Sequence, residues 1–178
     1  MIEVLDQVLP GVQLLAPRTS RDARGEFVKT FHAGAFAELG LDFAPVEEFF
    51  STSLRGVVRG MHFQLPPYQH AKLVYCIVGR VTDVVLDMRR HSLEFRKFAS
   101  AELSSANRRM LFIPAGVAHG FLAEEDSVMI YQTSTVHAPS HEGGVRWNSF
   151  GFDWGSTKPI LSQRDAGLPA FDELTSPF

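Results

Sequence analysis

Short apolar runs broken by turn residues recur along almost the whole chain. Many runs are rich in Val, Ile, Phe and Thr, which suit pleated strands, and most are separated by Gly, Pro, Asn, Asp or Ser. The pattern predicts about ten β-strands, over residues 11–17, 27–31, 46–53, 57–64, 71–79, 80–88, 95–103, 108–114, 118–126 and 127–135. Short strands at such regular spacing are typical of a sandwich or barrel, and about ten of them fit a jelly roll.

Only one segment shows a good helical pattern. Within residues 32–40, Phe36 and Leu39 lie three apart and Gly40 stands where a helix would end. Residues 18–26 have the composition of a turn. We therefore predict an all-β fold with one or two short helices. Because no repeat or linker divides the chain, we expect residues 1–178 to form one domain, with the irregular tail 155–178 packing back over it.

Composition narrows the class of protein. With 178 residues, 45% hydrophobic and 21% charged, the chain can bury a sizeable core and is not of the disordered class. A net charge of −3 provides no basic field, so nucleic acid is not the expected partner. A few arginines could still bind a small phosphorylated ligand.

The N-terminal residues bear on location, whereas the lone cysteine does not. The sequence MIEVLDQVLPGVQLLAP carries acids and a proline where a signal peptide needs a basic and then an apolar run. No segment approaches the length of a membrane span, so no membrane partner is expected. Cys76 lies in an apolar run and predicts a buried, inert thiol. We expect a cytoplasmic protein.

The run VVRGMHFQ places a histidine in an apolar strand. By strand alternation, His62 should face the same side as Gly60 and Gln64, whereas Arg59 and Met61 face the other. A buried imidazole without a partner is unfavourable. His62 therefore needs either a structural hydrogen bond or a chemical task.

The run PAGVAHGF has a P-x-G-x-x-H arrangement that resembles the second motif of the cupin superfamily. The first cupin motif would supply H-x-H and a glutamate, but here His62 is followed by Phe63 and Gln64. A metal would have only His62, His119 and His70 as ligands, so no metal site is predicted. A metal-dependent dioxygenase or sugar isomerase stays open as an alternative, as does a structural role for His119 in the core.

Six stretches together carry a closer resemblance. They are RDARGEF, VVRGMHFQ, AKLVYCIVGRVTDVVLDMRRHSLEF, ELSSANRRMLFIPAGVAHGF, IYQTSTVHAPSHEGGVRW and LSQRDA. In order and spacing they resemble the dTDP-4-dehydrorhamnose 3,5-epimerase family, from about residue 10 to residue 165. The resemblance implies a cupin-like jelly roll without metal or other cofactor, generally dimeric, that acts on nucleoside-diphosphate 4-keto-6-deoxy sugars.

The resemblance also implies catalytic roles. Epimerising a carbon next to a ketone needs a base, an acid on the opposite face and a group that stabilises the enolate oxygen. By resemblance His62 is the base, Asp165 the carboxylate that orients it, Tyr131 the acid, and Lys72 the residue near the keto oxygen. His119 matches a histidine close to the sugar.

Each of these residues also has a structural alternative. Tyr131 could be a strand aromatic at the rim of the barrel, and Lys72 a solvated lysine on a strand edge. Asp165 could cap a short helix, and Arg24 could be an ordinary turn residue. Only their joint occurrence in the order of the family favours the catalytic roles over these alternatives.

A second set of residues is implied to bind substrate. Arg24 and Arg59 match positions that contact the diphosphate, Phe27 offers a face for the base, and Glu142 matches a further contact. The resemblance further implies a homodimer formed largely by N-terminal strands, in which Arg24 could serve the partner's site.

The departures from the family fall mainly in recognition. Lys29 stands where the family tends to have glutamate, and the family's Gln-Asp-Asn is replaced by Glu47, Glu48 and Phe49. A pair of tyrosines near the sugar is represented by Val136 and His137, and a lysine by Arg164. We therefore predict the reaction type of the family and leave the nucleotide and the sugar open. A non-catalytic sugar-nucleotide binding protein is the remaining alternative.

Overall fold

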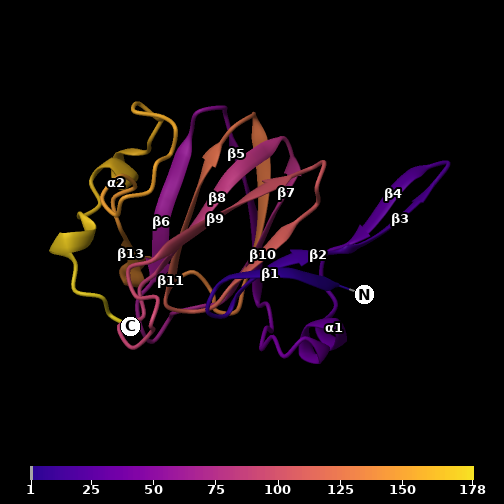
Figure 1. The fold of residues 1–178 in the computed structure, drawn as a ribbon, viewed down its shortest axis with the longest axis horizontal. Helices are drawn as coiled ribbons and strands as arrows, with labels where there is room; N and C mark the ends of the chain where they lie inside the picture. The colour runs from indigo at the N-terminus through magenta and orange to yellow at the C-terminus, as the bar shows by residue number, and fades with distance from the viewer. Residues whose placement is uncertain (1) are drawn as a thin grey trace.

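Two antiparallel sheets form the body of the protein in a computed structural model that describes residues 2–178 (Figure 1). The first sheet has six strands, in the order β1 (Glu3–Leu9), β2 (Val12–Ala16), β10 (Met110–Ile113), β7 (Lys72–Val78), β12 (Ser127–Thr133) and β5 (Glu47–Ser53). The second sheet has five, in the order β13 (Glu142–Gly144), β6 (Val58–Gln64), β11 (Val117–Ala123), β8 (Arg80–Asp87) and β9 (Phe98–Ser104). The predicted jelly-roll class is confirmed.

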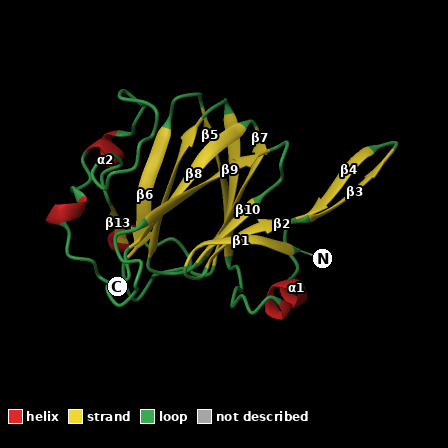
Figure 2. Cartoon of the chain, in the orientation of Figure 1, coloured by secondary structure: helices red, strands yellow, loops and turns green. Residues whose placement is uncertain are grey.

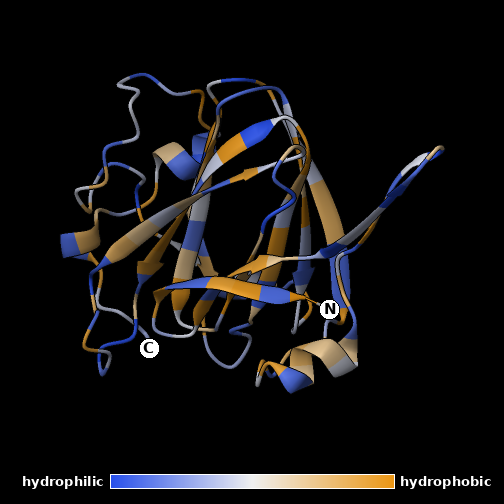
Figure 3. Cartoon of the chain, turned by 45° about the vertical axis from the view of Figure 1, so that its right-hand side comes forward, coloured by the Kyte–Doolittle hydropathy of each residue, from blue (hydrophilic) through white to orange (hydrophobic). Residues whose placement is uncertain are grey.

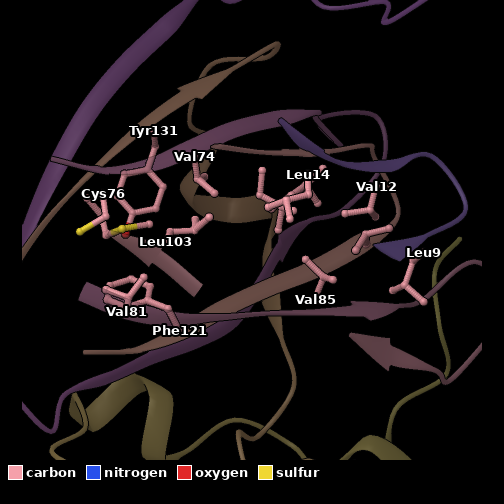
Figure 4. Close-up of a cluster of buried hydrophobic side chains, with 14 of the residues drawn as sticks. Leu9, Val12, Leu14, Val74, Cys76, Val81, Val85, Leu103, Phe121 and Tyr131 are labelled. Atoms are coloured by element: carbon pink, nitrogen blue, oxygen red, sulfur yellow. The ribbon is translucent and has the colours of Figure 1, made fainter. Parts of the chain in front are cut away.

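The side chains between the sheets form the central core. Strand alternation directs them inward, and on β12 every second residue from Ser127 to Thr133 is buried. Figure 4 shows this cluster, in which Val74 of the first sheet and Val85 and Phe121 of the second come together. Tyr131 belongs to the same cluster. The inner face of β12 therefore leads directly from the core into the site described below.

Each sheet also has a cover on its outer face. The predicted helix is α1 (Ala33–Glu38), and its buried Phe36 packs with Phe43 and Phe112 against the six-stranded sheet. On the five-stranded sheet, Trp154 and, from the tail, Phe171 join a second cluster. Figure 2 shows that this tail is mostly loop, with the short α2 (Gln163–Ala166) beside β6.

The prediction of a turn over residues 18–26 is wrong. This segment contains β3 (Arg18–Asp22) and the start of β4 (Gly25–Lys29), which pair as a separate hairpin. Its residues are nearly all exposed, so the apolar alternation that marks a strand is missing. The hairpin projects away from the two sheets (Figures 1 and 3). Strand β1 was not predicted either, and it too is mainly exposed.

A bulge on β6 shows that the predicted orientation of Arg59 is also wrong. His62 pairs with His119 and Arg59 with Phe121, so two residues of β6 stand opposite Gly120 alone. The strands approach so closely here that a Cβ on Gly60 would lie 2.6 Å from the Cα of Gly120. Arg59, expected on the opposite face, consequently lines the same cavity as His62.

Among residues 2–178, the structure contains no helix with the length and apolar character needed to cross a bilayer.

Candidate active site

A cavity of about 620 Å³ opens between the two sheets and collects most of the predicted site residues. Strands β6 and β11 form one wall, and β5, β7 and β12 form the other. The predicted residues that line it are Glu47, Phe49, Arg59, His62, Lys72, His119, Tyr131, His137, Glu142 and Arg164. Because the two walls belong to different sheets, a ligand between them would have protein groups on both of its faces.

His62 is held by a carboxylate from the tail. Its Nε2 lies 2.7 Å from Asp165 Oδ1, and the carboxylate is 4% exposed. Asp165 sits in α2, where its backbone N–H donates to the N-cap Ser162, and its Oδ2 accepts from the backbone N–H of Gly60. Burial favours the neutral acid, but the bonds with His62 and Gly60 outweigh it and lower the pKa of Asp165 to about 2.

A second group approaches the same imidazole nitrogen. Arg164 Nη2 lies 2.9 Å from His62 Nε2, while Arg164 Nη1 donates to Glu142 Oε2 at 2.8 Å. The pKa of His62 is lowered, first by burial and then by the cations Arg164 and Lys72, against the opposing effect of Asp165. His62 is therefore neutral at physiological pH, as a general base must be.

His119 forms a similar pair deeper in the protein. Its Nε2 lies 2.9 Å from Asp83 Oδ2, and the carboxylate is fully buried. Burial raises the pKa of Asp83, and the bond with His119 opposes that rise. The sequence analysis missed Asp83, although its spacing offered a signal. It stands between Val81 and Val85 on the inward face of β8, where an unpartnered acid would be unfavourable.

Lys72 is a half-buried residue at the start of β7, and its Nζ donates to the backbone carbonyl of His62 at 3.3 Å. Burial lowers its pKa to about 8. The ammonium therefore still carries its charge at neutral pH inside the cavity. The structure does not place it on a solvated strand edge, because β7 lies between β10 and β12.

Tyr131 lines the opposite wall with its hydroxyl 3.0 Å from Ser51 Oγ. Phe49 stacks on the phenol ring, with centroids 4.9 Å apart and planes inclined by 13°. Burial raises the pKa of Tyr131, and the bond with Ser51 only partly opposes it. The phenol therefore keeps its proton until a strong base takes it. Ser51 was missed in the sequence, where a serine on an edge strand gives no distinct signal.

Charged residues cluster at one end of the cavity. Glu142 Oε1 lies 2.9 Å from His137 Nε2, and Glu47 Oε2 accepts from the backbone N–H of His137 at 2.6 Å. Toward the other end of β5, Arg59 donates from Nε to Ser53 Oγ and from Nη2 to the carbonyl of Thr52, both at 2.9 Å. These contacts hold cations and acids at fixed positions at both ends of the cavity.

Three predicted residues do not line this cavity: Asp165, which contacts the lining residue His62, and the hairpin residues Arg24 and Phe27. Arg24 and Phe27 lie on the projecting hairpin, with the side chain of Arg24 90% exposed and paired with Asp22. Phe27 is 65% exposed and borders a different cavity, of about 430 Å³, between the hairpin and α1.

His70, the third candidate metal ligand, has another partner. Its Nδ1 lies 2.9 Å from Gln64 Nε2, an amide donor, and burial lowers its pKa to about 3. Over residues 2–178, no group of three or more His, Cys, Asp or Glu side chains is arranged to hold a metal ion.

The jelly roll holds a cavity with a histidine–aspartate pair at one wall and a tyrosine at the other, an arrangement that suits an enzyme that moves protons. A model of the dTDP-4-dehydrorhamnose 3,5-epimerase family matches residues 6–173, and the chain belongs to this family. The dTDP-4-dehydrorhamnose 3,5-epimerase of Shigella flexneri is 36% identical over 168 residues, which cover 92% of this chain and 93% of that protein.

Solved structures agree with the assignment. A dTDP-4-dehydrorhamnose 3,5-epimerase from Bacillus anthracis, with TDP and PPi bound, superposes with a TM-score of 0.94 at 32% identity. The match covers 96% of this chain and all of that one. A dTDP-6-deoxy-D-glucose-3,5-epimerase from Legionella pneumophila, in complex with dTDP-4-keto-L-rhamnose, gives 0.92 at 29% identity, covering 97% and 94%.

Proposed function

We propose that this protein epimerises a nucleoside-diphosphate 4-keto-6-deoxyhexose at C3, C5 or both, as a step of deoxysugar biosynthesis. One observation carries the proposal: His62 and Tyr131 stand on the two opposite walls of one cavity, one from each sheet. Epimerisation requires a base and an acid on opposite faces of the reacting carbon.

The proposed reaction begins at His62. The imidazole removes the proton from a carbon next to the C4 ketone, and Asp165 stabilises the imidazolium that results. The electron pair moves into the enolate, whose oxygen is stabilised by the ammonium of Lys72. Tyr131 then returns a proton to the same carbon from the opposite face. The reaction is redox-neutral, so it needs no electron-carrying cofactor.

The high pKa of Tyr131 is compatible with this role. A phenol that is hard to ionise does not lose its proton to water, but an enolate carbon is basic enough to take it. Ser51 and Phe49 hold the ring in one orientation through the hydrogen bond and the stack described above. The phenolate formed must later regain a proton before the next turnover.

Arg59 is our candidate for the diphosphate, because its guanidinium is anchored by Ser53 and Thr52 and still lines the cavity. The relatives crystallised with TDP or with a dTDP-linked sugar support a nucleotide-sugar ligand. We further propose a cytoplasmic location, as expected from the sequence.

We also propose that the enzyme is a homodimer in which the hairpin β3–β4 completes the site of the other subunit. A two-stranded hairpin is at best marginally stable alone, and Phe27 on it is 65% exposed. On the body, β5 is an edge strand that exposes Phe49 and Phe50 beside the cavity. The hairpin of a second copy would cover such an edge and deliver Arg24 and Phe27.

Mixing two inactive variants tests the shared site. Arg24→Ala and His62→Ala should each have little activity alone. In a mixed dimer, one of the two sites receives both the native Arg24 and the native His62. Because about half of the dimers in an equal mixture are mixed, about a quarter of all sites should be active. A mixture no more active than its components would show that Arg24 does not act across the interface. A concentration-independent monomer in analytical ultracentrifugation would exclude the dimer altogether.

The reaction itself is tested with a panel of 4-keto-6-deoxy nucleotide sugars in D₂O. NMR should locate deuterium at C3, C5 or both, and the pattern identifies the carbons that are epimerised. Metal analysis of the purified protein is run in parallel, because stoichiometric iron, zinc or nickel would favour the metal-dependent alternative. Binding of the sugar nucleotides without any deuterium uptake would favour a binding protein.

A further inference from the structure

The guanidinium of Arg164 touches the base and its carboxylate at the same time. Nη2 lies 2.9 Å from His62 Nε2, Nε lies 3.4 Å from Asp165 Oδ1, and Nη1 lies 2.8 Å from Glu142 Oε2. All three nitrogens of the fork are therefore engaged, with two acids and one imidazole. The side chain is nonetheless 52% exposed, so it can leave this position.

The contacts at His62 Nε2 are mutually exclusive. A neutral imidazole nitrogen either carries a proton and donates, or has a lone pair and accepts. Arg164 offers only donors and an ionised Asp165 only acceptors, yet both approach the same Nε2, at 2.9 and 2.7 Å. A donation from Arg164 places the ring proton on Nδ1, whereas a donation to Asp165 leaves the lone pair on Nδ1.

The choice matters because Nδ1 is the nitrogen left for the substrate. Within residues 2–178 no protein group bonds to Nδ1, and His62 borders the cavity. With the proton on Nδ1, the ring offers no lone pair to a substrate carbon. With the proton on Nε2, donated to Asp165, Nδ1 is a base.

We propose that Arg164 is a positioning residue that competes with Asp165 for His62 Nε2, and that an anionic ligand ends this competition by drawing Nη2 away. This inference rests on the proposed function, since it assigns a resting state to the same base. When Arg164 turns toward a ligand oxygen, Nε2–H donates to Asp165 and the lone pair appears on Nδ1. Proton removal is thereby tied to the arrival of a phosphorylated substrate.

The charges around His62 agree with a device of this kind. Three titratable residues face the ring besides Arg164: Asp165 from α2, Lys72 from β7 and His119 from β11. Of these four side chains, that of Arg164 is the one more than half exposed. Glu142 on β13 keeps the guanidinium near the ring by binding Nη1. The pKa of Glu142 is lowered by its bonds with His137 and Arg164, which outweigh burial, so this anchor stays ionised.

The test observes the tautomer directly. Nitrogen NMR of the histidine-labelled enzyme should show a mixture of the Nδ1–H and Nε2–H tautomers of His62 in the free protein, and the Nε2–H tautomer alone once TDP is saturating. In Arg164→Met the proton should sit on Nε2 with or without TDP. The matched control is Arg80→Met, an ion-paired arginine of similar exposure outside the cavity, which should behave as the native protein.

The pH profiles of kcat and kcat/KM test the same inference if the NMR signals of the labelled variant cannot be assigned. In Arg164→Met the acid limb of kcat/KM, which reports the free enzyme, should move to higher pH because a cation next to the imidazole is lost. The acid limb of kcat should not move, because the ligand has already displaced Arg164 in the complex. Arg164→Lys, which keeps a charge but not the fork, should fall between the two.

Two results would overturn the inference. One is a free native enzyme with the proton already on Nε2 alone, and the other is a tautomer mixture that TDP does not change. Neither depends on turnover, so they are distinct from a failure of the epimerase proposal, which the deuterium experiment would reveal. If the acid limbs of kcat and kcat/KM shift together in Arg164→Met, the arginine affects only the pKa of His62 and not its tautomer, which would also contradict the inference.

Discussion

The protein contains two histidine–aspartate pairs that use the same groups in different surroundings. In the pair of His62 and Asp165 the atoms are 2.7 Å apart and the imidazole is 28% exposed, whereas in the pair of His119 and Asp83 they are 2.9 Å apart and the imidazole is 4% exposed. The first joins a strand to a short tail helix, and the second joins two neighbouring strands.

The two carboxylates respond to these surroundings in opposite ways. Burial opposes ionisation in both, but hydrogen bonds overcome it at Asp165 and lower its pKa, while at Asp83 burial dominates and raises the pKa. A base needs access to substrate and a stabilised counter-charge, and only His62 has both. An imidazole–carboxylate contact alone therefore does not identify the base. The exposure of the imidazole and the freedom of its second ring nitrogen decide whether it can act on the substrate.

Removing the two histidines in turn should separate the pairs most clearly. We expect His62→Ala to lower turnover and exchange of substrate hydrogen with D₂O by about 10⁴-fold or more, since His119 on the same wall is 4% exposed and bound to Asp83. His119→Ala should retain exchange and chiefly raise KM. His91→Ala, on an exposed loop, is the control. A His119→Ala loss larger than that of His62→Ala would reverse the assignment.

The carboxylates should differ in what they support. Asp165→Asn should lower kcat by about 10³-fold, because the amide disturbs the tautomer and charge of His62 without deleting the base. Asp83→Ala should instead lower the free energy of unfolding by about 3 kcal/mol, because it leaves a buried partner unpaired. Steady-state kinetics and urea denaturation of both variants measure the contrast. Equal losses of stability would contradict it.

Tyr131→Phe tests the wall opposite His62. Inversion should fall by roughly 10²–10⁴-fold, the range for a lost general acid, while exchange into the starting sugar survives because His62 still removes the proton. Deuterium NMR follows exchange and inversion in one sample. Tyr68→Phe, outside the cavity, serves as the control. Inversion at a near-native rate would remove Tyr131 from its role.

The smallest effect concerns pH. His62 must be neutral, so kcat/KM should rise with pH through its pKa, which lies below the ordinary 6.5. Lys72 must be charged, so activity should fall as pH passes about 8, by about tenfold per unit. In Lys72→Arg the alkaline limb should disappear, because guanidinium does not titrate in this range. A limb that persists would belong to another group.

The sequence by itself determined the elements that rest on local chemistry. Alternation and turn residues predicted most strands of both sheets, though not β1 or β13, and Phe36, Leu39 and Gly40 predicted α1. The family motifs predicted which residues gather in the cavity. Where a strand is exposed, as over residues 18–26 of the hairpin, alternation is absent and the prediction failed.

Only the tertiary structure decided which side chains meet. His62 and Asp165 are 103 residues apart, and Tyr131 and Ser51 are 80 apart, so their contacts depend on strand register and on how the tail crosses β6. The bulge at Gly60 turns Arg59 into the cavity against simple alternation. Hydrogen bonds act over about 3 Å, and spacing along a chain cannot fix distances of that size between strands and a tail.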